Sequence, residues 1–195
     1  MFIVFEGIDG TGKSTQVKLL KEALEKNGDT VITSFEPTNG TYGSLLRSSA
    51  TRPEGRYSLE EEFDLFLKDR HEHVEQLINP ALERGDVVIL DRYYYSTMAY
   101  QGARGLDPTV IRERNEEFAT IPDLVFVLTL PVEASLQRIG VRDGEGDAFE
   151  ARENLEKCAD IFMSLDDQNV VFIDAQRPPE EVHEEVRRLT LGFMA

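Results

Sequence analysis

Cysteine is nearly absent from this sequence, which contains Cys158 and no second one. An intrachain disulfide is therefore excluded, and a reducing compartment fits the chain better than secretion. Long hydrophobic runs are also missing, since no apolar stretch approaches the roughly 20 residues that span a bilayer. The apolar start Met1–Phe5 runs into Glu6 too soon for the core of a signal peptide. We therefore expect a cytoplasmic protein with no membrane partner.

Basic residues are scarce as well. Lysine and arginine total 21 against 37 aspartates and glutamates, which gives a formal net charge of −16. The average surface of such a chain repels the phosphates of DNA and RNA, so a polymeric nucleic acid is not an expected partner. An anionic ligand must be bound against the field of the protein itself. Each basic residue in a loop is therefore informative.

The pattern of apolar residues indicates an α/β fold. No internal repeat or low-complexity linker divides the chain, so residues 1–195 are interpreted as one domain. Short apolar runs alternate with longer segments of helical period, which is typical of a parallel sheet flanked by helices in a three-layer arrangement. Five runs predict a five-stranded parallel sheet of buried strands. They are Phe2–Phe5, Val31–Phe35, Val87–Leu90, Leu124–Leu130 and Val170–Ile173.

Local capping signals mark several helix ends. The helix after the first strand is predicted to end near Gly28, because glycine suits a C-terminal cap. Ser58 and Glu61 have the spacing of a capping box and predict the start of another helix. Asp107 followed by Pro108 predicts a third start, since aspartate caps helices and proline fits their first turn.

Charged residues directly follow each of the first three predicted strands. Ligands of open parallel sheets bind beyond the carboxyl ends of the strands. We therefore expect the functional site to be built from these loops. The residue pairs are Glu6-Gly7, Glu36-Pro37 and Asp91-Arg92.

The segment from Gly7 to Ser14 matches the P-loop pattern, and it lies between a predicted strand and a predicted helix, as that motif requires. Its glycines let backbone N–H groups turn inward, and the helix terminus adds a positive dipole where phosphates lie. Lys13 would contact the outer phosphates of ATP, and the Ser14 hydroxyl would ligate Mg²⁺. The alternative is a glycine-rich turn without a ligand. The residues predicted to bind ATP here are Gly7, Ile8, Asp9, Gly10, Thr11, Gly12, Lys13, Ser14 and Thr15.

A P-loop alone does not separate kinases from GTPases, motors or switches. The sequence has no Asn-Lys-x-Asp string for reading guanine, and no Asp-x-x-Gly switch follows the third strand. Asp91 is placed to hold the water shell of the metal ion, so Ser14 and Asp91 are the predicted metal positions. Arg92 can bridge the phosphates of donor and acceptor. These features favour transfer of a phosphoryl group to a small acceptor.

The acceptor side carries a family resemblance. Residues Asp91–Gly102, with the sequence DRYYYSTMAYQG, resemble the signature of thymidylate kinases. Similar segments at Phe5–Gly10, Glu36–Thr38 and Phe66–Arg70 occur in the same order, so the resemblance runs through nearly the whole chain. It implies a P-loop kinase fold, usually homodimeric, that transfers phosphate from ATP to dTMP with Mg²⁺.

The spacing of Phe66 and Arg70 suits a nucleobase. The two residues are four apart and share a helix face, so the ring can stack on a planar base while the guanidinium donates to its carbonyl edge. The alternative is that Phe66 is a core residue and Arg70 a solvated helix charge. The surrounding family match favours the base site.

The resemblance assigns further acceptor positions. It places Ser96 and Thr97 near the base, Tyr100 on the sugar where a 2′-hydroxyl would clash, and Asp9 at the 3′-hydroxyl. Arg47 and Arg92 would grip the acceptor phosphate, although Arg47 could equally be an ordinary surface residue. The full set assigned to dTMP is Asp9, Glu36, Pro37, Arg47, Phe66, Arg70, Arg92, Ser96, Thr97, Tyr100 and Gln101.

Members of this family place an extra catalytic arginine in the P-loop or in a flap. Gly10 occupies the loop position, so the polar stretch at about 138–150 is expected to be a mobile flap that supplies Arg142 or, as second candidate, Arg138. The loop at Ala175 resembles the one that packs on adenine. The predicted catalytic residues are Lys13, Arg92, Asp9, Arg142 and Arg138.

A general base is not required for this chemistry. The acceptor is a phosphate with a second pKa of about 6, so its attacking oxygen is already ionised at neutral pH. Catalysis then depends on alignment and charge neutralisation. His71, His73 and His183 lack metal-ligand spacing with the cysteine and are interpreted as helix-surface residues.

Two alternatives to a dTMP kinase stay open at this point. The chain could phosphorylate another nucleotide or a nucleoside. It could also be a nucleotide-dependent switch without transfer activity, because the flap is short and acidic and has Ala148 where relatives often carry arginine.

Overall fold

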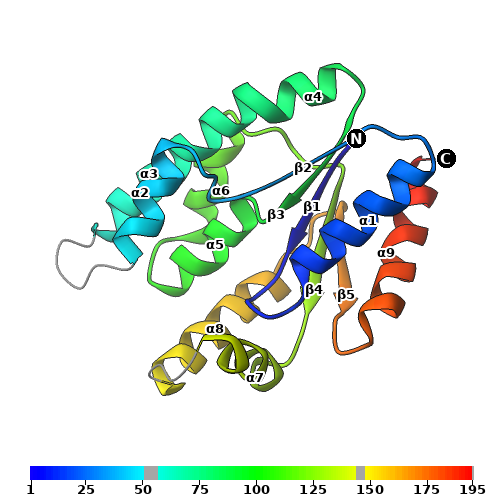
Figure 1. Cartoon of the computed structure of the whole chain (residues 1–195). Helices are drawn as coiled ribbons and strands as arrows, with labels where there is room; N and C mark the ends of the chain where they lie inside the picture. Colours follow the sequence, from blue (N-terminus) through cyan, green and yellow to red (C-terminus); the bar gives the residue numbers. More distant parts are fainter. Residues whose placement is uncertain (51–56, 144–147, 195) are drawn as a thin grey trace.

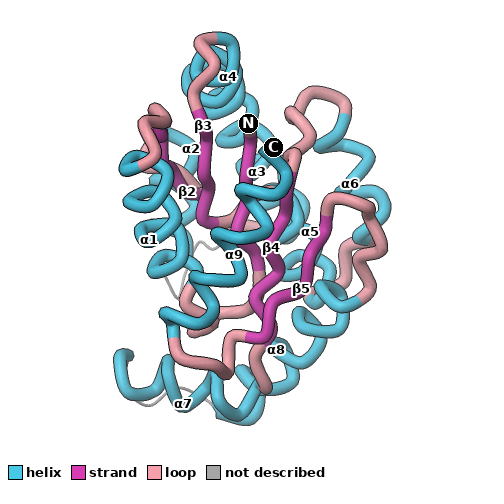
Figure 2. Tube along the Cα trace, turned by 90° about the vertical axis from the view of Figure 1, so that its right-hand side faces the viewer, coloured by secondary structure: helices cyan, strands magenta, loops and turns pink. Residues whose placement is uncertain are grey.

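The computed structural model describes residues 1–50, 57–143 and 148–194, and of residues 50, 141–143 and 148–151 it describes the backbone only. In this part of the chain, five strands form one parallel sheet in the order β2-β3-β1-β4-β5, which Figure 2 shows side by side. The strands are β1 (Phe2–Glu6), β2 (Val31–Phe35), β3 (Val87–Asp91), β4 (Leu124–Thr129) and β5 (Val170–Asp174).

Helices cover both faces of this sheet, as Figure 1 shows, so the predicted three-layer α/β fold is confirmed. No helix in the described part of the chain has the length and apolar composition needed to cross a membrane. The helices are α1 (Lys13–Lys26), α2 (Thr41–Ala50), α3 (Leu59–His73), the π-helical turn η1 (Val74–Ile78), α4 (Asn79–Glu83), α5 (Tyr94–Ala103), α6 (Pro108–Glu116), α7 (Val132–Asp143), α8 (Ala148–Met163) and α9 (Pro179–Met194).

The five predicted strands are confirmed to within one residue at each end. The expectation that all five are buried is correct only for the inner ones. β1, β3 and β4 are buried along their length, apart from an end residue of β3 and of β4, whereas the outer strands β2 and β5 are largely half-exposed. An outer strand has a neighbour on one side only, so fewer side chains screen it from water.

The side chains of β1 point alternately into two hydrophobic cores. Phe2 and Val4 face a core made with α3, α5 and α8, while Ile3 and Phe5 face a second core made with α1 and α9. Figure 2 shows α1 and α9 together in front of the sheet. Successive side chains of a strand point to opposite faces, which explains why a continuous apolar run is needed in a sheet covered on both sides.

The predicted helix caps are confirmed. After α1, Gly28 has φ +98°, its N–H donates to Glu25 O, and the next N–H donates to Leu24 O, which is the hydrogen-bond pattern of a Schellman motif. Ser58 and Glu61 form the reciprocal bonds of a capping box at the start of α3. The Asp107 carboxylate accepts from Thr109 N at 2.8 Å at the start of α6.

The expected flap lies between α7 and α8. α7 extends to Asp143 and α8 starts at Ala148, so helical structure occupies much of the range 138–150. Residues 144–147 and the side chain of Arg142 lie outside the described residues.

Candidate active site

The phosphate loop leaves the centre of the sheet. Gly7, directly after β1, has φ +125°, and a Cβ atom there would lie 2.4 Å from the carbonyl oxygen of Leu128 on β4. Only glycine therefore permits this close approach of the two backbones. The loop then turns into α1, whose first residue is Lys13. The N-terminus of a helix consequently faces the cavity above the loop, as phosphate binding requires.

Lys13 lies folded against the loop. Its buried Nζ donates to the carbonyl oxygens of Gly7 at 3.0 Å and Ile8 at 2.9 Å. Burial and the positive charge of Arg92 lower the pKa of Lys13 to about 7, against the opposing effects of Asp91 and Asp9. In the ligand-free site, this lysine is therefore only partly charged near neutral pH.

We expect nucleotide binding to be coupled to proton uptake by Lys13. A bound polyphosphate favours the ammonium form and raises the pKa of Lys13 above about 7. At pH 8 the free enzyme holds Lys13 mostly neutral, so binding should take up nearly a full proton. At pH 6 Lys13 is already protonated, so its contribution to the uptake should be close to zero. Calorimetric titration with ATP, in buffers of different ionisation enthalpy, measures this quantity. Binding heats that are independent of the buffer at pH 8 would contradict the expectation.

A phosphate-site cavity of about 310 Å³ opens above the loop. Within it the Ser14 hydroxyl donates to a carboxylate oxygen of Asp91 at 2.5 Å, so the two predicted metal positions are adjacent. Arg138 reaches over the loop from α7 and donates to the carbonyl oxygens of Gly10 and Ala175. The cavity is lined by Asp9, Gly10, Gly12, Lys13, Ser14, Thr15, Asp91, Arg92 and Arg138.

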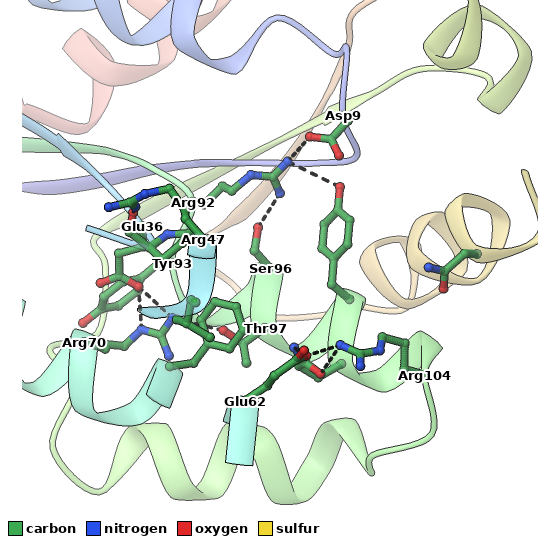
Figure 3. A pocket seen from close by; sticks show the side chains of 16 residues that line it. Asp9, Glu36, Arg47, Glu62, Arg70, Arg92, Tyr93, Ser96, Thr97 and Arg104 are labelled. Carbon is green, nitrogen blue, oxygen red and sulfur yellow. Dashed lines mark hydrogen bonds and ion pairs between the residues drawn. The ribbon is translucent and has the colours of Figure 1, made fainter. Parts of the chain in front are cut away.

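A second cavity, of about 480 Å³, lies beside the first and shares Asp9 and Arg92 with it. Arg92 Nη2 contacts Asp9 Oδ1 at 2.5 Å, and Figure 3 shows this pair at one end of the second cavity. Although burial alone would raise the pKa of Asp9, Arg92 and Lys13 hold it below its ordinary value. Lining residues are Asp9, Glu36, Pro37, Leu46, Arg47, Glu62, Phe66, Arg70, Arg92, Tyr93, Ser96, Thr97, Tyr100, Gln101, Arg104 and Asn154.

Arg92 is held in a constrained conformation. Its φ of +73° lies in the left-handed region, which is unfavourable for a residue with a side chain. Its N–H donates to Phe5 O at 2.9 Å, and Nη1 donates to Ser96 Oγ at 2.9 Å. The fully buried Glu6 accepts from the N–H groups of Tyr93 and Ser96 and from the Ser96 hydroxyl. The end of β1 thus caps α5 and fixes the guanidinium between the two cavities.

The same burial affects the titration of Glu6. It raises the pKa of Glu6 to about 7, while the hydrogen bond from Ser96 and the charge of Arg92 act to lower it. An ionised Glu6 can only accept, so the Ser96 hydroxyl donates to it and offers its lone pairs to Arg92.

Arg70 forms the floor of the second cavity. Its side chain is 1% exposed, so the alternative of a solvated helix charge is wrong. Nε and Nη2 both contact one carboxylate oxygen of Glu36, at 2.8 and 2.7 Å, and Nη2 also donates to Thr97 Oγ1. Nη1 donates to Asn115 Oδ1. Phe66 is half-buried and lines the same cavity, so the ring and the guanidinium do lie together.

The loop that carries Pro37 is tied to α3. The buried carboxylate of Asp69 accepts from Thr38 N at 2.7 Å, from the Thr38 hydroxyl at 2.6 Å and from Gly43 N at 3.0 Å. Arg47, on the helix that follows, donates to Pro37 O at 2.8 Å. Asp69 therefore holds the loop and the start of α2 on the side of the cavity where Arg47 lies exposed.

The opposite rim of the cavity is polar. Arg104 forms an ion pair with Glu62, which Figure 3 shows. Gln101 Nε2 donates to the same carboxylate at 3.4 Å. Asn154 of α8 completes the lining on this side. The rim therefore joins α3, α5 and α8.

The structure brings most predicted residues together. All of the residues predicted for the acceptor line the second cavity, and the loop residues from Asp9 to Thr15 line the first one except Thr11. The other loop residues, Gly7, Ile8 and Thr11, do not line the phosphate-site cavity, and Ile8 and Thr11 are buried. Ala175 is buried and contributes a carbonyl oxygen to Arg138. The position of the Arg142 side chain is not described, so its predicted role stays a prediction.

Several important side chains were missed. His73 was interpreted as a surface residue, and this is wrong, because it is buried and contacts Glu36. Glu6, Asp69 and Asn115 are buried polar groups that hold the site, and no role was predicted for their side chains. Glu6 and Asp69 lie in segments that carry the family resemblance, and Glu6 also ends a buried apolar run, whereas Asn115 lies in no motif.

The arrangement of the sheet, the loop and the two adjoining cavities is that of the P-loop α/β class of nucleotide-binding proteins. Comparison with known proteins gives a narrower result: residues 5–186 match the family described as thymidylate kinase. The chain belongs to the thymidylate kinase family.

Individual relatives agree with this result over almost their whole length. The thymidylate kinase of Akkermansia muciniphila is 56% identical over 192 residues, which cover 98% of this chain and 92% of the relative. That of Desulfotalea psychrophila is 47% identical over 94% of this chain and 91% of the relative. That of Xanthomonas euvesicatoria is 45% identical over 100% of this chain and 85% of the relative.

Proposed function

We propose that the protein transfers the γ-phosphoryl group of ATP to dTMP, giving ADP and dTDP. One observation carries this proposal: two cavities of suitable size adjoin and share Asp9 and Arg92. A donor on the phosphate loop and an acceptor in the second cavity would thus meet at one guanidinium. Membership of the thymidylate kinase family supports dTMP as the acceptor.

The charges of the second cavity support a bound monophosphate. Arg70, Arg92 and Arg104 are already paired with carboxylates. The contacts of Arg47 within the described residues are with the Pro37 carbonyl and the Ser44 hydroxyl, so its charge is available to an anion. Arg47 would hold the acceptor phosphate from one side and Arg92 from the other. The base would then lie towards Phe66 and Arg70.

The chemical step needs alignment and neutralisation. Lys13 would contact the outer phosphates of ATP, and Arg92 would offset the charge that develops between donor and acceptor. Because the acceptor oxygen is already ionised, no side chain has to remove a proton from it. Asp9, held beside Arg92, would orient the sugar hydroxyl. Arg138, which donates to Gly10 O from α7, would contact the donor nucleotide.

Ser14 and Asp91 fit a magnesium ion. Both offer oxygen atoms, the ligands that Mg²⁺ prefers, and they lie together in the phosphate cavity. Within the described residues there is no group of three or more His, Cys, Asp or Glu side chains that could hold a metal on its own. This agrees with an ion that arrives with the nucleotide and is held partly by phosphates. When bound, Mg²⁺ would neutralise phosphate charge.

Two further proposals rest on the family resemblance. We infer a homodimer, because the family is usually dimeric. We also infer that the enzyme works in the cytoplasm, where its nucleotide substrates occur. The solution mass from light scattering tests the first proposal.

A screen of acceptors tests the proposed function. The purified chain is incubated with Mg-ATP and one monophosphate at a time, and ADP release is followed in a coupled assay. We expect dTMP to give the highest kcat/KM among dTMP, dUMP, UMP, CMP and AMP. Preference for another monophosphate would replace the substrate proposal by the alternative kinase. ATP binding without any product would instead support the non-catalytic switch.

A further inference from the structure

His73 lies buried at the end of α3, behind the second cavity. Its side chain is 4% exposed, and both ring nitrogens have partners. Nδ1 lies 3.0 Å from Glu36 Oε1, and Nε2 lies 2.8 Å from Ser34 Oγ. Neither contact is local, because Ser34 and Glu36 are 39 and 37 residues away in the sequence. His73 thus ties α3 to the end of β2.

The partners fix the tautomer of His73. The Glu36 carboxylate is an acceptor only, so Nδ1 must carry the proton that it donates. Nε2 of the neutral ring is then an acceptor, and the Ser34 hydroxyl donates to it.

Glu36 is held from two sides. His73 contacts Oε1, while Arg70 contacts Oε2 through both Nε and Nη2. Figure 3 shows the contact between Glu36 and Arg70 at the end of the cavity away from Asp9, with Thr97 beside them. Both nitrogens converge on this one oxygen, so the position of Oε2 determines where the Nε–Nη2 edge of the guanidinium lies. Thr97 and Asn115 contact the guanidinium as well. A change in the Glu36 carboxylate that displaces Oε2 would therefore shift the Nε–Nη2 edge of Arg70 within the cavity.

We propose that His73 is a positioning residue for the acceptor base: it orients the Glu36 carboxylate, and through Glu36 Oε2 it positions the Nε–Nη2 edge of the Arg70 guanidinium. His73 is absent from the cavity lining and would not touch the substrate. This inference rests on the proposed function, since it assumes that an acceptor occupies the second cavity.

Two amide substitutions separate the two contacts of the ring. An asparagine amide nitrogen can take the place of Nδ1, whereas a glutamine amide nitrogen can take the place of Nε2. His73→Asn should therefore keep the donor to Glu36 and lose the contact with Ser34. His73→Gln should keep a polar group near Ser34 and lose the donor to Glu36. Both variants leave an amide in the same buried position, so they form a matched pair.

We expect the two variants to differ in KM for dTMP. A hydrogen bond to a charged group commonly changes affinity by about tenfold or more, so His73→Gln should raise the KM for dTMP about tenfold. His73→Asn and the further control Ser34→Ala should stay within about twofold of the wild type. The KM for ATP should be unchanged in all three, because His73 acts on the acceptor side.

Several outcomes would overturn this role. An equal rise of the dTMP KM in both His73 variants would show that any change at this position disturbs the fold. A parallel rise of the ATP KM in His73→Gln would show the same. If His73→Gln does not fold, ¹⁵N NMR of the wild type still decides, because a proton on Nε2 instead of Nδ1 is incompatible with the proposal.

Failure of this inference can be told apart from failure of the proposed function. The wild-type acceptor screen is independent of His73. If it identifies another monophosphate, the comparison of variants is made with that acceptor. If it identifies none, dissociation constants for dTMP replace KM, and equal binding by both variants then refutes the positioning role.

Discussion

Replacing Arg92 by alanine is expected to reduce kcat by about a thousandfold, which is the scale for removing a cation that stabilises transferring phosphoryl groups. Arg92 is the cation shared by the two cavities, so its loss should also weaken binding of both ATP and dTMP. Asp9 would at the same time lose its ion pair. Single-turnover and steady-state rates with ATP and dTMP measure the chemical step and the two KM values.

Two companion variants make the Arg92 result specific. Arg92→Lys keeps the charge but not the planar fork that contacts Asp9 and Ser96, so it should recover only part of the lost rate. Arg112→Ala removes an arginine that instead pairs with Asp167 through two nitrogens, and it should keep wild-type turnover. Wild-type turnover in Arg92→Ala would show that the shared guanidinium has no part in transfer.

Lys13→Ala is expected to lower kcat/KM for ATP by about a thousandfold. Its effect on the binding of the two nucleotides should differ from that of Arg92→Ala. Lys13 lines the phosphate cavity and is not part of the lining of the second one. Binding of dTMP should therefore be preserved, whereas that of ATP should weaken. Calorimetric titration with each nucleotide separately tests this contrast between Lys13 and Arg92.

The matched control for Lys13 lies on the same helix. Lys21 is half-exposed on α1 and pairs with Glu25 at 3.7 Å, so Lys21→Ala should leave both binding constants unchanged. Circular dichroism should report folded protein for both lysine variants, because the Lys13 ammonium is already disfavoured by burial in the free enzyme. Equal loss of dTMP binding and ATP binding in Lys13→Ala would contradict the assignment of donor and acceptor cavities.

The sequence alone determined the features that consecutive residues encode. The five apolar runs gave the strands, and the spacing of Gly7, Lys13 and Ser14 gave the phosphate loop. Capping signals at Ser58 and Asp107 gave helix starts. Such signals are local, because the hydrogen bonds and the periodicity behind them involve residues a few positions apart.

Only the tertiary structure decided how charged groups are buried. Arg70 meets Glu36 and Asn115, which are 34 and 45 residues away, and these partners make its burial possible. Glu6 and His73 likewise find their partners on other elements, at Ser96 and at Glu36. A buried charge is stable only when distant residues satisfy it, and nothing in the spacing of one sequence states which residues those are. The order of the strands in the sheet brings these distant residues together.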